Sequence, residues 1–158
     1  MLENTYPFIK DMPPQEMAVW LMAQHITNAF GSAYVRKAGN NLLLMEQRPS
    51  FVRWAEGVRF TSAEDYPNEK IYVCHADTFN KTKPACIYIL NHSMTYFLRL
   101  NAWTSKSWER RKHKNDAGQY YTALWAAKNL CESYPLGAKP LWKKGLAKKT
   151  KTKTKTND

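Results

Sequence analysis

Apolar residues recur along this chain in two different periods, and these periods predict its helices and strands. In EMAVWLMAQHITNAFG (16–31) they follow at steps of three and four residues, which is typical of one face of a helix. Pro14 suits the first turn of such a helix and Gly31 suits its end. The residues on the predicted apolar face are Val19, Met22, Ala23, Ile26 and Phe30.

Shorter apolar runs then indicate a series of strands. SAYVRKAG (32–39) and KIYVCHADTF (70–79) are strand-like, and LLLME (42–46) is either a buried strand or a piece of helix. SFVRWAEGVRFTSAEDYP (50–67) mixes aromatic residues with Arg53 and Arg59, and Gly57 is expected to break it. ACIYILN (85–91) and MTYFLRLN (94–101) flank a tight turn around His92 and Ser93, and they predict an antiparallel hairpin.

The last part of the pattern predicts two further helices. Thr104 is a suitable N-cap for SKSWERRKHK (105–114), and Asp116 for QYYTALWAAKNLCESY (119–134). The expected fold class is therefore α+β, a mixed α/β sandwich. It would have an N-terminal helix, a four- to five-stranded sheet that contains the hairpin, and these two helices.

Charge divides the 158-residue chain into a body and a tail. Residues 139–158 hold eight lysines and one aspartate, a net of +7, which leaves +4 of the total +11 for residues 1–138. We expect one globular domain over 1–138 and a lysine-rich, flexible tail over 139–158. A polycation on a folded body favours a polyanionic partner, although a solubilising tail is the alternative.

Neither a membrane span nor a secretory signal is evident in the sequence. It has no apolar run of about 18 residues, and MLENTYPFIKDMPP (1–14) has no apolar core. Cys74, Cys86 and Cys131 are odd in number and lack CxxC spacing, which favours a reducing, cytoplasmic compartment and no metal site. We expect the thiols to be idle.

A cluster of cations within 106–114 is the clearest candidate binding feature, and Arg53 and Arg59 form a thinner second set. Nucleic-acid binding requires cations for phosphates and often aromatic rings for bases. Trp103 and Trp108 flank the cluster, but we expect them in the core, and the cations are also compatible with a solvated helix face. The predicted phosphate ligands are Lys106, Arg110, Arg111, Lys112, Lys114, Arg53, Arg59 and the tail lysines Lys143, Lys144, Lys148 and Lys149.

Catalytic candidates are few. A metal-dependent nuclease needs two or three carboxylates for Mg²⁺ or Mn²⁺ and a lysine near the attacking water. Glu46 ends a predicted strand, Glu16 lies in the first helix, and Lys37 lies between them. Asp77 would share a strand face with His75, as a base and its orienting acid or as an ordinary hydrogen-bonded pair.

The segments SAYVRKAGNNLLLMEQ, WAEGVRFTSAEDYP and KIYVCHADTF resemble the core of small PD-(D/E)XK nuclease-like proteins, which phages and mobile elements often encode. The resemblance covers roughly residues 32–80. It rests on Gly39, Asn40, Glu46, Trp54, Gly57, Thr61, Ala63, Asp65 and Tyr66.

This resemblance implies an acidic residue and Glu-x-Lys on adjacent strands, but the chain has Tyr34-Val35-Arg36-Lys37 where Glu-x-Lys would stand. The resemblance therefore implies a degraded metal site and a non-catalytic protein that binds DNA or RNA, without a cofactor. Two alternatives remain open. One is an active endonuclease with Mg²⁺ or Mn²⁺, and the other is an interaction factor that inhibits a host enzyme by docking on an acidic protein surface.

Overall fold

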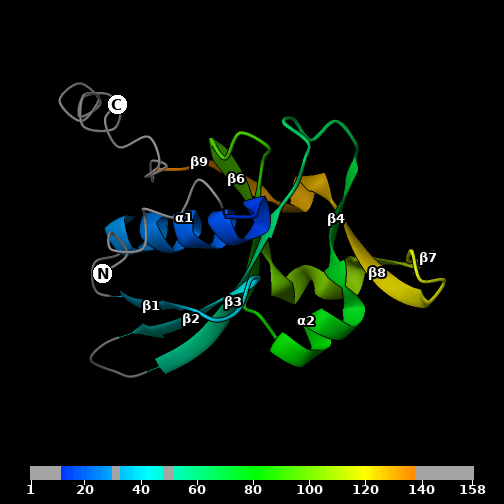
Figure 1. Ribbon diagram of the computed structural model, residues 1–158, viewed down its shortest axis with the longest axis horizontal. Coiled ribbons are helices and arrows are strands. Elements are labelled where there is room, and N and C mark those ends of the chain that lie inside the picture. The colour runs from blue at the N-terminus through cyan, green and yellow to red at the C-terminus, as the bar shows by residue number, and fades with distance from the viewer. Residues whose placement is uncertain (1–11, 30–32, 48–51, 138–158) are drawn as a thin grey trace.

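The computed structural model describes residues 12–29, 33–47 and 52–137 (Figure 1). Its helices are α1 (Pro14–Ala29) and α2 (Ala76–Thr82), with 3-10 turns η2 (Ala102–Ser107) and η3 (Lys128–Leu130). Its strands are β1 (Ala33–Lys37), β2 (Leu42–Gln47), β3 (Val52–Phe60), β4 (Lys70–His75), β5 (Cys86–Leu90), β6 (Tyr96–Asn101), β7 (Glu109–Lys114), β8 (Tyr120–Ala127) and β9 (Glu132–Pro135).

A mixed six-stranded sheet in the order β1-β2-β3-β5-β6-β9 is the centre of the fold. Strands β1, β2 and β3 form an antiparallel meander. The chain then passes through β4 and α2 before β5 pairs in parallel with β3. β6 and β9 extend the sheet antiparallel beyond β5.

Both faces of this sheet are covered, and the side chains of β5 alternate between them. Tyr88 and Leu90 pack with α1 in one core cluster, whereas Ile87 and Ile89 belong to a second cluster on the opposite face. β5 is buried at every residue, as its uninterrupted apolar run predicts. The predicted face of α1 is confirmed at Val19, Met22, Ala23 and Ile26, while Phe30 lies outside the described residues.

A second, three-stranded antiparallel sheet in the order β4-β8-β7 packs on the other face of the large sheet. Ile71 and Val73 of β4 and Leu124 and Ala126 of β8 enter the second core cluster. Beyond this contact the β7–β8 hairpin extends away from the body (Figure 1). We call the face of the small sheet that is turned away from the core its outer face.

The α+β class is confirmed, and so is the antiparallel hairpin β5–β6, in which Cys86 pairs with Asn101 and Leu90 with Phe97. The large sheet contains six strands, one more than the upper number expected. No helix among the described residues has the length and apolarity that crossing a bilayer requires.

The two helices expected after residue 104 are wrong. SKSWERRKHK forms the end of η2 and strand β7, and QYYTALWAAKNLCESY forms β8, η3 and β9. Both segments contain good helix formers, but Leu124 and Ala126 alternate with Tyr121, Ala123 and Trp125 in a two-residue period. Cross-strand packing of this kind overrides local propensity.

Gly57 does not break its segment, because β3 continues through it from Val52 to Phe60. The residue is buried and pairs with Ile87 of β5. A Cβ atom at Gly57 would lie 3.2 Å from Ile87 Cγ1, so the absence of a side chain allows the two strands to pack closely.

The turn of the hairpin depends on Asn91, whose side chain is fully buried. Its Oδ1 accepts hydrogen bonds from the backbone N–H groups of Thr95 (2.9 Å) and Tyr96 (3.1 Å). Its Nδ2 donates to Glu64 Oε2 at 3.1 Å and Thr95 Oγ1 at 3.0 Å. His92 lies in this turn, as predicted, and its side chain is exposed.

We expect Asn91→Ala to lower the free energy of unfolding by about 1–3 kcal/mol, because the partly buried backbone N–H groups of Thr95 and Tyr96 lose their acceptor. Urea denaturation followed by circular dichroism measures this change. His92→Ala, one residue further along the same turn, is the matched control and should cost less than about 0.5 kcal/mol. Equal costs for the two variants would contradict the role assigned to the Asn91 amide.

Candidate nucleic-acid interface

The predicted basic helix is a strand, so its cations are distributed differently from the expectation. Along β7, Arg110, Lys112 and Lys114 are exposed, whereas Glu109, Arg111 and His113 alternate with them and are half-buried. Lys106 lies apart from this row, in η2, and is exposed. We call Arg110, Lys112 and Lys114 the basic row.

Arg111 does not belong to the basic row, and its charge is already partnered. Its Nε donates to Glu109 Oε2 at 2.8 Å, while Lys70 Nζ donates to Glu109 Oε1 at 2.7 Å. The guanidinium carbon of Arg111 lies 4.2 Å from the centre of the Trp125 ring. Arg111 therefore engages Glu109 and Trp125 on the ring-bearing side of the strand, and its role as a phosphate ligand stays a prediction.

Hydrogen bonds from Arg111 and Lys70 hold the pKa of Glu109 at about 2, below its usual 4.5. Because the folded-state pKa is depressed, these contacts contribute stability above pH 4.5, and that contribution is lost as the pH falls towards 2. In Glu109→Gln we expect a weaker dependence of the melting temperature on pH across this window. Glu69→Gln is the neighbouring control, and it should retain the dependence of the unmodified protein.

Aromatic side chains from three strands gather on the outer face of the small sheet. Tyr72 of β4 pairs with Trp125 of β8, and their ring centres lie 5.7 Å apart. His75 stacks on Tyr121 with ring centres 4.1 Å apart and planes 12° from parallel. Trp125 Nε1 donates to His113 Nε2 at 3.3 Å. We call these five residues the ring cluster, and sequence reasoning missed it because it placed β8 in a helix.

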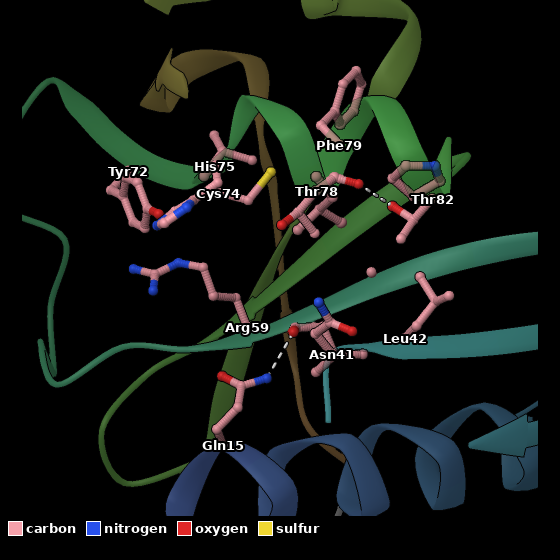
Figure 2. Close-up of a pocket in the computed structure, with 15 residues that line it drawn as sticks. Gln15, Asn41, Leu42, Arg59, Tyr72, Cys74, His75, Thr78, Phe79 and Thr82 are labelled. Carbon is pink, nitrogen blue, oxygen red and sulfur yellow. Dashed lines mark hydrogen bonds between the residues drawn. The ribbon is translucent and has the colours of Figure 1, made fainter. Parts of the chain in front are cut away.

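A cleft of about 220 Å³ lies beside the ring cluster, between α2, β3 and β4 (Figure 2). Tyr72 and His75 line it from β4, and the side chain of Arg59 extends from β3 towards them (Figure 2). Gln15 of α1 fixes the opposite wall, because its Nε2 donates to Val58 O at 2.8 Å and its Oε1 accepts from Phe60 N–H at 2.8 Å. None of the described lining residues is acidic.

Arg59 is the cation of this cleft. Its guanidinium carbon lies 4.5 Å from the centre of the Tyr72 ring, and its Nε is buried without a hydrogen-bond partner among the described residues. Burial lowers the pKa of Arg59, although a guanidinium stays charged at neutral pH. Such a group is suited to an anionic oxygen from outside the chain. Arg53 differs from it, since it is exposed and its Nε lies 3.4 Å from Glu46 Oε1.

Of the four catalytic candidates, Lys37 and Glu16 come together, whereas Glu46 and Asp77 lie elsewhere. Lys37 pairs with Leu43 at one end of the β1–β2 hairpin, while Glu46 pairs with Tyr34 towards the other end. Lys37 Nζ lies 3.9 Å from Glu16 Oε2. No group of three or more His, Cys, Asp or Glu side chains among the described residues is arranged to hold a metal ion.

Asp77 and His75 do not share a strand face, which corrects the expected pairing. β4 ends at His75, and Asp77 lies exposed in the first turn of α2.

One further acidic residue, inside the fold, was not predicted as a candidate. Glu56 is buried on the α1 side of the large sheet, where its carboxylate accepts hydrogen bonds from Trp54 Nε1 and Tyr88 OH, both at 2.9 Å.

The tryptophans near the basic row behave differently from each other. Trp108 is buried in the second core cluster, as expected. Trp103 is 75% exposed, which contradicts the expectation that it lies inside.

Burial raises the pKa of Cys74 and Cys131 to about 11 and that of Cys86 to about 12, so the thiols are unreactive near neutral pH. The tail lysines Lys143, Lys144, Lys148 and Lys149 lie outside the described residues.

The fold and this surface together define an α+β protein with a cationic, ring-bearing accessory sheet. Comparison with known proteins gave no match to a family model, to a curated protein or to a solved structure.

Proposed function

We propose that this protein binds nucleic acid through the small sheet and does not cleave it. The observation that carries the proposal is the basic row, three exposed cations at alternate positions of one strand. Successive members of such a row lie about 7 Å apart, so neighbouring cations can contact different phosphates of one nucleic-acid strand. The ring cluster lies on the opposite face of the same sheet, because Arg110, Lys112 and Lys114 pair with Leu124, Thr122 and Tyr120 and not with Trp125 and Tyr121. Arg59 lies beside the ring cluster.

An edge strand that carries lysine and arginine has another use, since such charges prevent strands of different molecules from pairing. That use needs no ligand, and it does not account for an arginine in a cleft without acidic neighbours. Phosphate binding accounts for both features. The expected ligand is DNA or RNA recognised chiefly through its backbone, in an intracellular setting.

The non-catalytic part of the proposal rests on the separation of Glu46 from Lys37 and on the ion pairs that engage Glu46 and Glu16. We also propose the nuclease-like ancestry that residues 32–80 suggest. A mixed sheet flanked by helices supports it. An acidic protein partner remains the alternative for the same cations.

Fluorescence anisotropy of the full chain with labelled DNA and RNA tests this function. We expect binding whose log Kd rises linearly with the logarithm of the salt concentration, because bound phosphates release counterions. No binding to either nucleic acid at 20 mM salt would contradict the proposal. The same samples with Mg²⁺ or Mn²⁺ should remain uncut, and cleavage that disappears in Glu46→Ala would contradict the non-catalytic assignment.

A further inference from the structure

The ring cluster is not part of the hydrophobic core. Tyr72, Tyr121 and Trp125 belong to neither core cluster, whereas their neighbours along the strands, Ile71 and Leu124, do. The alternation of a strand sends these two sets of side chains to opposite faces. The fold therefore buries one face of the small sheet and leaves its aromatic face accessible.

The rings form a continuous path with a cation at each end. Arg59 lies over Tyr72, Tyr72 contacts Trp125 edge to face, and Arg111 lies over Trp125. Beside this path, Tyr121 stacks on His75, and His75 is exposed and lines the cleft. The stack therefore ends where the cleft that contains Arg59 begins.

We propose that the ligand of this surface is single-stranded nucleic acid, with bases stacked on the ring cluster and a backbone phosphate on Arg59. This inference rests on the proposed function and specifies its substrate class. Only unpaired bases offer their faces to protein rings, because in a duplex these faces are covered by neighbouring bases. A sheet that presents rings on its open face, with cations around it, is suited to that ligand.

The rival ligand is a duplex, since a two-stranded ribbon fits the major groove. Groove reading requires hydrogen-bond donors and acceptors directed at base edges. On the outer face of β7, Glu109 and Arg111 engage each other, and His113 accepts from Trp125. The outer face therefore offers mainly ring surface, which favours stacking over groove reading.

Anisotropy with a single-stranded 20-mer and the matching duplex tests the inference, using the full chain and four variants. Tyr121→Leu and Trp125→Leu remove rings from the outer face. Tyr121→Phe keeps the ring and should restore binding. Tyr134→Leu is the matched control, because Tyr134 is a 41% exposed tyrosine on β9 of the large sheet, outside the small sheet.

We expect the single strand to bind at least about tenfold tighter than the duplex, and each leucine variant to weaken single-strand binding by about 5- to 100-fold. Tyr121→Phe and Tyr134→Leu should bind like the unmodified protein, and thermal melting shows whether each variant is folded. Duplex binding that is equal or tighter, or unaffected single-strand binding in folded leucine variants, would overturn the inference and leave the proposed function standing. Binding to neither ligand would overturn both.

Discussion

Replacing Arg110, Lys112 and Lys114 together by glutamine is expected to weaken nucleic-acid binding by about 10- to 100-fold at 50 mM salt. The three side chains are exposed at alternate positions of β7, so they present three charges on one side of the strand. Each lost phosphate contact should also lower the slope of log K against log salt by about 0.7–0.9, or roughly 2 for the whole row. The salt titration is therefore as informative as the affinity.

The control for this variant removes three equally exposed charges elsewhere. Arg36→Gln, Lys81→Gln and Lys83→Asn change exposed residues on β1, on α2 and just after α2, outside the three strands of the small sheet. Asparagine is chosen at position 83 because the backbone there has a φ of 47°. The control should lose less than about threefold in affinity, since it changes only the overall field. Equal losses in both variants would show that net charge, and not this strand, determines binding.

Exchanging all eight lysines of residues 139–158 for glutamine is expected to have the largest effect, a loss of roughly a hundredfold or more at low salt. This segment supplies +7 of the net charge of +11. If about half of its lysines contact phosphates, the salt slope should fall by about 3. The exchange keeps the chain length constant, so the effect reports charge alone.

The melting temperature should stay within about 2 °C of the unmodified protein in this variant, because residues of the described part of the chain, 12–137, form the two core clusters. Affinity that is unchanged would remove the tail lysines from the interface. A large fall in melting temperature would contradict the division of the chain into a body at 1–138 and a tail.

The elements that the sequence could predict are those whose signals are local. α1 has a helical apolar face with prolines at its start, and β5 is an uninterrupted apolar run that joins β6 through a short turn. β8 could not be predicted in the same way. QYYTALWAAK is compatible with both periods, and it forms a strand because β4 and β7 lie on either side of it.

The candidate site could be predicted only in part, because it also depends on how the strands pair. The basic row was visible as composition, but its separation from Arg111 depends on the two-residue period of β7 and on Glu109. The ring cluster combines residues from 72 to 125, whose proximity is a product of strand pairing. Arg59 was noted only as a cation, because the cleft around it exists only once α2 and β4 are packed.

The most direct test of nucleic-acid binding by the small sheet is an NMR titration of the ¹⁵N-labelled chain with a short oligonucleotide. We expect the largest chemical-shift changes within the body to fall on β4, β7, β8 and Arg59. Changes concentrated on α1 and the β1–β2 hairpin, or no changes at saturating oligonucleotide, would contradict it.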